Sequence, residues 1–142
     1  MRFSLILIST LFIVSSFAQS NWNELTVIGN NTGLNSINKD DLKEVFLGNV
    51  TSWPNKNNVT IVLPSTKYYN ADSLITLALN KSHNTLRRYW LSLVFQGRAN
   101  PPIYLDSNEA ILKFVTENKG AIAMMIGYKG PELDNLLIIE EK

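Results

Sequence analysis

Apolar and polar residues follow two different spacings along the chain, and these spacings predict where strands and helices lie. Short apolar runs, several of them rich in β-branched residues, occur at 25–29, 59–63, 121–126 and 136–139. Turn-forming glycine, proline or asparagine bounds the first three runs, as is typical of β-strands. The last two runs are wholly apolar, which indicates strands in a sheet that helices cover on both faces.

Other segments repeat their apolar residues every three or four positions, the spacing of an amphipathic helix. The expected helices are 39–48, two consecutive helices between 70 and 97, and a fourth between 106 and 120. Asn38 precedes the first of these and is a preferred helix cap. Trp90 is expected on the buried face of the third helix, and Asp106 opens an acid-first capping box before the fourth.

The order of these elements predicts a single α/β domain with three layers, in which a mostly parallel central sheet is flanked by about four helices. The strand at 25–29, the helix at 39–48 and the strand at 59–63 are expected to form a βαβ crossover, which joins two parallel strands. No internal repeat, heptad or low-complexity segment interrupts the pattern, so no domain boundary is expected after the first residues.

Those first residues have the pattern of a secretory signal peptide. Arg2 supplies a positive charge, residues 5–14 form a short apolar core, and small residues lead to Ala18. We expect cleavage after Ala18, so that 1–18 is a signal peptide and 19–142 is an exported α/β domain. A membrane anchor is the alternative, but the apolar character fades early for a spanning helix. The mature protein is expected to be periplasmic or secreted.

Composition excludes several functional classes. The chain has no cysteine, so the exported domain has neither disulfides nor thiol chemistry. Residues 19–142 carry 12 basic and 12 acidic side chains, a balance that argues against a nucleic-acid partner.

No catalytic or cofactor motif is recognisable. The single histidine, His83, is expected in a cap or turn between two helices, and the acidic residues are not at metal-ligand spacing. The sequence contains no phosphate-binding loop, nucleophile elbow or dinucleotide fingerprint. We therefore expect a protein that is not an enzyme and that binds no metal or cofactor.

A set of residues in fixed order carries a resemblance to a known family. A Leu-x-x-x-Phe-x-Gly helix end precedes a Trp-containing turn, and an Asn-Glu helix start leads to a Gly-Ala-Ile strand. The matching residues are Leu42, Phe46, Gly48, Trp53, Asn108, Glu109, Gly120, Ala121 and Ile122. From Leu25 to Ile126 the chain thus resembles short phosphate ABC transporter substrate-binding-like proteins, which are related to one lobe of the type II periplasmic binding fold. The resemblance implies an exported solute-binding-like module with a membrane transporter as a partner.

In that family the loop after the strand corresponding to 59–63 carries a Ser-Gly-Thr motif that opens a helix and cradles phosphate. Backbone N–H groups and the helix dipole attract an anion there. In this chain Tyr68, Tyr69 and Asn70 stand in place of the motif, and Asp72 follows in the first helical turn. Tyrosines are expected to crowd a backbone that glycine would leave open. The resemblance therefore implies weak or lost binding of phosphate or another small oxyanion.

The residues that remain candidates for a looser anion site are Ser65, Thr66, Lys67, Asn70 and Arg98. Asn70 has the alternative role of a simple helix cap, and Arg98 that of a solvated surface charge. The alternative function is a non-catalytic protein-interaction module that kept the fold and lost the ligand, with another protein or a second copy of the chain as its partner. A small secreted hydrolase built on His83 has the least support.

Overall fold

The structure, a computed structural model, describes residues 25–128 and 136–139. Its elements are β1 (Leu25–Gly29), β2 (Ser36–Ile37), α1 (Lys39–Phe46), β3 (Thr60–Pro64), α2 (Ala71–Leu79), α3 (His83–Phe95), β4 (Ile103–Leu105), α4 (Asn108–Glu117), β5 (Ala121–Ile126) and β6 (Leu136–Ile139). The expected signal peptide at 1–18 lies outside the described residues. Within the described ranges, no helix combines the length and the apolar character that a bilayer span requires.

The six strands form one sheet in the order β2-β6-β1-β5-β3-β4. Strand β3 is parallel to both β4 and β5, and β2 is parallel to β6, whereas β1 is antiparallel to its neighbours β5 and β6. Five strands of the six therefore run in one direction, with β1 reversed. The expected mostly parallel sheet is confirmed.

The predicted βαβ crossover from β1 through α1 to β3 is wrong. Strand β5 lies between β1 and β3, and β1 pairs with it antiparallel from Leu25 opposite Ile126 to Gly29 opposite Ile122. The pairing differs because β5 is the strand that is buried most completely. Every residue from Ala121 to Met125 is buried, so β5 takes a central position in the sheet and has a neighbouring strand on each side.

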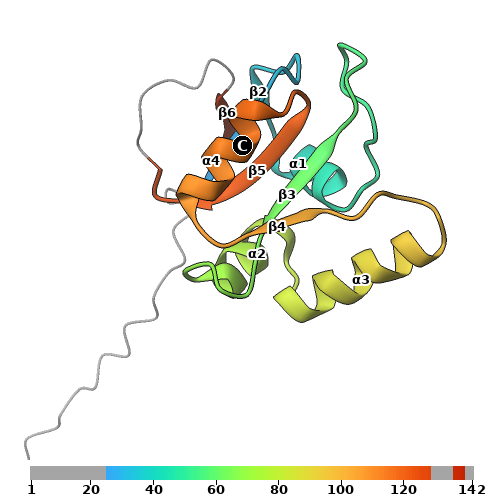
Figure 1. Cartoon of the computed structure of the whole chain (residues 1–142), viewed down its shortest axis with the longest axis vertical. Helices are drawn as coiled ribbons and strands as arrows, with labels where there is room; N and C mark the ends of the chain where they lie inside the picture. The colour runs from blue at the N-terminus through green and yellow to red at the C-terminus, as the bar shows by residue number, and fades with distance from the viewer. Residues whose placement is uncertain (1–24, 129–135, 140–142) are drawn as a thin grey trace, which may run out of the picture.

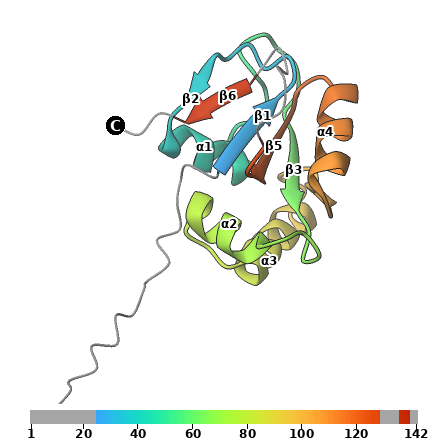
Figure 2. The ribbon, with the colours of Figure 1, turned by 90° about the vertical axis from the view of Figure 1, so that its left-hand side faces the viewer.

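Helices cover both faces of the sheet. Helix α4 packs on one face of β5, and α1 and α2 lie on the opposite face (Figures 1 and 2). Helix α1 turns Leu42, Val45 and Phe46 into the core, as its apolar spacing predicts. The predicted three-layer α/β arrangement is confirmed, and α3 runs beside α2, past the edge of the sheet that ends in β4.

The N-cap of α1 is the residue that the sequence predicts, whereas the N-cap of α4 is not. The side chain of Asn38 caps α1 by accepting from the backbone N–H of Asp41 at 2.8 Å. At α4 the predicted cap, Asp106, is wrong, because Ser107 accepts from the N–H of Ala110 instead. Asp106 is held elsewhere: its carboxylate accepts a hydrogen bond from the hydroxyl of Ser65 in the loop after β3.

Candidate functional site

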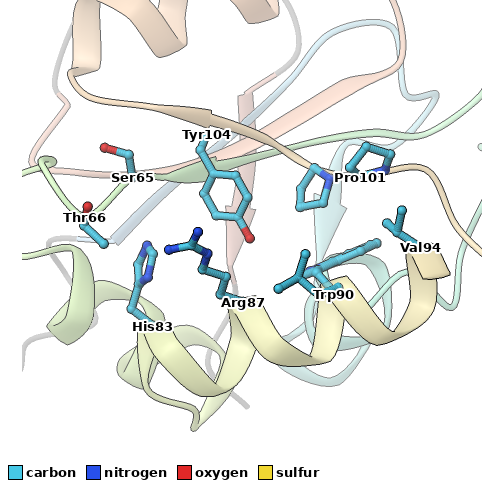
Figure 3. A pocket seen from close by; sticks show the side chains of 10 residues that line it. Ser65, Thr66, His83, Arg87, Trp90, Val94, Pro101 and Tyr104 are labelled. Carbon is cyan, nitrogen blue, oxygen red and sulfur yellow. The ribbon is translucent and has the colours of Figure 1, made fainter.

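A cavity of about 430 Å³ lies between α3 and the edge strand β4 (Figure 3). We call it the α3 pocket; it is lined by Ser65, Thr66, His83, Arg87, Trp90, Leu91, Val94, Pro101, Pro102 and Tyr104. One wall is a single face of α3, because its residues recur three or four positions apart. The opposite wall comes from β4 and the prolines that lead into it. Its volume is in the range of about 300–1,000 Å³ that is usual for small-molecule sites.

The pocket has a buried floor and an exposed rim. Trp90, His83 and Pro102 are buried, whereas Arg87 and Leu91 are exposed. Prolines are tolerated beside β4 because it is an edge strand and has no further neighbour to bond. A solute entering from the rim would therefore reach a wall that is largely apolar.

Contact with a glycine fixes the position of Trp90. A Cβ atom on Gly48 would lie 2.7 Å from Cη2 of Trp90, which is closer than real carbon atoms approach. Gly48 also has φ of +77°, a left-handed conformation that ends α1. The indole can thus pack against the end of α1 only because residue 48 has no side chain.

Three buried polar atoms of the pocket wall have no hydrogen-bond partner among the described residues. They are His83 Nδ1, Trp90 Nε1 and Tyr104 Oη. A buried polar group left in this state costs about 1–3 kcal/mol, so protein interiors contain few of them. All three belong to residues that line the α3 pocket, so their unused hydrogen-bonding capacity is concentrated at one cavity.

Two hydrogen bonds hold His83, one through its ring and one through its backbone. Its Nε2 lies 3.1 Å from the carbonyl oxygen of Pro64, and its backbone N–H donates to Oδ1 of Asp72 at 2.6 Å. A carbonyl oxygen can only accept, so Nε2 carries the hydrogen of that bond. In the neutral ring, Nδ1 is then an acceptor without a described donor, on a residue that lines the pocket.

Arg87 supplies the positive charge of the pocket wall. Its guanidinium extends toward the ring of Tyr104 (Figure 3), and the rings of His83 and Tyr104 lie with their centroids 6.0 Å apart. Burial raises the pKa of the Tyr104 hydroxyl, and the charge of Arg87 lowers it by a smaller amount. None of the described residues that line the cavity is acidic, and the carboxylates of Asp106 and Asp72 lie behind the wall, where they accept hydrogen bonds from Ser65 and from the backbone of His83.

Of the anion-site candidates, Ser65 and Thr66 line the α3 pocket, whereas Lys67, Asn70 and Arg98 lie outside its wall. The hydroxyl of Ser65 donates to Asp106 and accepts from the backbone N–H of Lys67 at 3.1 Å. The exposed guanidinium of Arg98 lies 3.5 Å from the side-chain oxygen of Gln96. The candidates are therefore not gathered around one point.

Asn70 is the N-cap residue of α2, as the alternative role suggested, but its side chain does not cap the helix. Asn70 precedes α2 in the left-handed conformation, with φ of 54°, and its side chain makes no capping hydrogen bond. Asparagine tolerates this conformation better than most residues, which explains its presence at this position without a cap.

The two tyrosines of the loop point in different directions. Tyr68 is 6% exposed and its side chain enters the core, whereas Tyr69 is 76% exposed. The sequence suggested that Tyr68 crowds the outer side of the loop, but its side chain instead lies in the core, and its hydroxyl bonds to Asn108 at the start of α4 and to Ile126 at the end of β5. Only Tyr69 extends outward from the place where the resemblance implies a phosphate site.

Sequence reasoning did not assign Arg87, Trp90 or Tyr104 to a binding site. The usable signal was the helical spacing of His83, Arg87 and Val94, which puts a cation and an imidazole beside the apolar face of α3. Tyr104 gave no signal, because β4 has three residues and is too short for a period to appear.

A second cavity of about 390 Å³ lies against α1, and its wall includes Asp41, Glu44 and Trp53. Both carboxylates already accept hydrogen bonds, from Asn38 and Asn49 respectively. Over the described part of the chain, no three His, Cys, Asp or Glu side chains are grouped closely enough to hold a metal ion. The α3 pocket is the better candidate for a ligand because three buried polar atoms of its lining residues have no partner among the described residues.

No family model and no curated protein matches the sequence. Among solved structures, the chain is similar to an ABC-type phosphate transport receptor from Vibrio cholerae, with 14% sequence identity and a TM-score of 0.46. The match covers 72% of this chain and 40% of the receptor, so the chain spans well under half of the receptor's length. At this identity and TM-score the likeness assigns neither a ligand nor a partner to the chain.

Proposed function

We propose that this chain is a non-catalytic, solute-binding-like module that binds a small molecule in the α3 pocket. One observation carries the proposal: His83 Nδ1, Trp90 Nε1 and Tyr104 Oη are buried, lack described partners and belong to the wall of one cavity. A core with a purely structural role would gain about 1–3 kcal/mol by pairing or removing each such group. Apolar walls with a few well-placed polar atoms are the usual composition of a small-molecule site.

We propose further that the module works in the periplasm or outside the cell. The support is the leader pattern of a charged start, an apolar run at 5–14 and small residues before Ala18. A membrane transporter, the partner that the sequence resemblance implies, would meet the exported domain in that compartment.

Phosphate-like oxyanions are proposed to bind weakly or not at all in the loop after β3. The single hydroxyl hydrogen of Ser65 is directed to Asp106, whose negative charge repels an anion. A second carboxylate, that of Asp72, lies in the first turn of α2, where the helix dipole would otherwise attract an anion. These two charges support weak or lost oxyanion binding.

The lack of catalysis is part of the same proposal. His83 Nε2 faces the carbonyl oxygen of Pro64, which is neither a nucleophile nor an acid, and Nδ1 has no described partner. A histidine that acts as a general base needs a hydrogen-bonded nucleophile or an orienting acid. This environment supports a binding role for His83 over a hydrolytic one.

A protein-interaction module is the second candidate, because α3 exposes apolar side chains outside the pocket floor. Phe95 is 88% exposed and Leu91, one helical turn earlier, is 48% exposed. For this candidate, the Leu91→Ser/Phe95→Ser double variant would change the mass measured in solution by sedimentation. An unchanged monomeric mass for both proteins would argue against self-association.

The solute-binding proposal is tested by screening the purified protein with a library of small fragments, using amide NMR signals. Binding is expected to shift signals of α3 and β4 residues. The Val94→Trp variant fills the pocket, because Val94 is part of its wall, and should lose the response. Phe95→Trp is the matched control on the same helix, since Phe95 is exposed and does not line the pocket.

Retention of the response in Phe95→Trp and its loss in Val94→Trp would support the proposal. Two results would oppose it. Either no fragment shifts the signals of α3 and β4, or the shifts persist unchanged when tryptophan fills the pocket.

A further inference from the structure

We propose that the ligand of the α3 pocket is a small organic acid with a flat apolar body, one carboxylate and one hydrogen-bond donor, and that the pocket prefers it to an inorganic oxyanion. This inference rests on the proposed function, because it assigns a chemical class to the solute. Three features of the wall carry it: its apolar surface, its single cation and the hydrogen-bonding roles of its unpaired atoms.

The apolar surface calls for an apolar body in the ligand. Trp90, Leu91, Val94, Pro101 and Pro102 make up half of the lining residues. An inorganic oxyanion would lose water at such a wall without gaining contacts, and the desolvation of a charge without compensation is unfavourable. A planar ring can instead pack against Pro101 and the indole of Trp90, which belong to opposite walls of the cavity (Figure 3).

The single cation of the described wall, Arg87, favours a ligand with one negative charge. Arg87 lines the cavity, and it is the only arginine, lysine or acidic residue among the described residues of the wall. Guanidinium pairs with carboxylate through two parallel hydrogen bonds, and its position at the rim lets it meet the charge where a solute enters. A monoanion matches this wall better than a dianion does.

The unpaired atoms require both an acceptor and a donor from the ligand. Trp90 Nε1 can only donate, so it needs an acceptor. His83 Nδ1 is an acceptor, because Nε2 donates to Pro64, and so it needs a donor such as a hydroxyl group. Tyr104 Oη can do either. A hydroxylated ring carboxylate supplies both kinds of group on an apolar body.

The test titrates the purified protein with para-hydroxybenzoate, its neutral amide para-hydroxybenzamide, benzoate and inorganic phosphate. We expect the hydroxy acid to bind about tenfold more tightly than the amide, as the loss of a charge-assisted hydrogen bond implies. Benzoate, which lacks the donor for His83, should bind several-fold more weakly than the hydroxy acid. Phosphate should not displace the hydroxy acid at equal concentration.

Two matched variants assign the effect to the pocket. Arg87→Gln should remove the preference for the acid over the amide, while binding of the amide stays within about twofold. Arg88→Gln is the control, because Arg88 is the next residue of α3, is exposed and does not line the cavity. Thermal melts of both variants verify that they are folded.

The outcomes separate this inference from the proposed function. If fragments bind in the α3 pocket but the amide equals the acid, or if Arg88→Gln has the effect expected of Arg87→Gln, the organic-acid assignment is wrong and the solute-binding proposal stands. If phosphate displaces the hydroxy acid at equal concentration, the assignment is also wrong. If no probe and no fragment shifts the pocket residues, the proposed function fails and the assignment fails with it.

Discussion

The hydroxyl of Tyr68 lies 2.5 Å from Oδ1 of Asn108 and donates a hydrogen bond to it. The amide of Asn108 donates to the carbonyl oxygen of Ile126 at 3.1 Å, and the backbone N–H of Ile126 donates back to the Tyr68 hydroxyl at 2.9 Å. The three groups form a closed ring that joins the loop after β3, the start of α4 and the end of β5. Tyr68 therefore links these three segments of the chain through its hydroxyl group.

Replacing Tyr68 by phenylalanine should lower the free energy of unfolding by about 1–3 kcal/mol, because the Ile126 N–H and the Asn108 oxygen lose their shared partner. Urea melts measure the change. Tyr69→Phe is the control and should have almost no effect, since Tyr69 is 76% exposed. Equal stability of the two variants would mean that the ring does not stabilise the fold.

Gly120 meets two requirements that only glycine satisfies. Its φ is +85°, and a Cβ atom would overlap the carbonyl oxygen of Asn58. Its own carbonyl oxygen accepts from Trp53 Nε1 at 2.8 Å and from the N–H of Thr60 at 3.0 Å. A side chain at this position would therefore displace the start of β3 and the turn that holds Trp53.

We expect Gly120→Ala to be much more damaging than Gly97→Ala, the matched control. Gly97 also has a positive φ, +66°, but a Cβ atom there would have no neighbour within 4 Å. The control should lose about 1–2 kcal/mol from the left-handed conformation alone. Gly120→Ala should lose at least about 2 kcal/mol more from overlap with backbone. Similar melting curves for the two variants would contradict this description of the β3 start.

Tyr104→Phe should leave the stability of the unliganded protein unchanged or raise it by up to about 1 kcal/mol, because it removes a buried hydroxyl that has no described partner. Binding of para-hydroxybenzoate should weaken in the same variant. Calorimetric melts and titrations measure the two quantities. A clear loss of stability would mean that the hydroxyl has a structural partner.

The stability of the protein should fall as pH rises above about 10. Burial raises the pKa of Tyr104 and of Tyr68 above their ordinary value of 10.0; for Tyr68 a hydrogen bond from Ile126 offsets part of the rise, and the charge of Glu109 adds to it. Above that pH the unfolded chain releases these protons while the folded chain keeps them, so the free energy of unfolding decreases with pH. Tyr104→Phe should reduce this slope in urea melts at alkaline pH, and an identical slope would count against burial of the phenol.

Inorganic phosphate should bind with a dissociation constant no tighter than about 0.1 mM at physiological salt. Asp106→Asn should tighten this binding by about two- to fivefold, because it removes a repelling charge beside Ser65. Titration calorimetry measures both proteins. Submicromolar binding by the unmodified protein would show that the loop after β3 is a true phosphate site.

Elements with a clear helical period or a sufficiently long apolar run were predictable from sequence. The helices repeat apolar residues every three or four positions, and the four longer strands are apolar runs of at least four residues. β2 and β4 were missed, because runs of two and three residues have no detectable period. The crossover was wrong because strand pairing is decided by burial across the whole chain, and β5, near the end of the sequence, lies between β1 and β3.

Only part of the candidate site was predictable. Ser65 and Thr66 were identified because they follow a strand, and both line the α3 pocket. Arg87 was missed because an arginine on an amphipathic helix, here next to Arg88, is typical of an ordinary surface charge. Its proximity to Tyr104 depends on how α3 packs beside β4, which no local pattern in the sequence encodes.

The central claim is that the α3 pocket holds a small solute, and a crystal structure of the protein grown with saturating para-hydroxybenzoate tests it most directly. We predict electron density for the ring between α3 and the prolines before β4, with ligand atoms within hydrogen-bond distance of Trp90 Nε1 and His83 Nδ1. Density for the compound only elsewhere on the protein, with water alone in the α3 pocket, would contradict the claim.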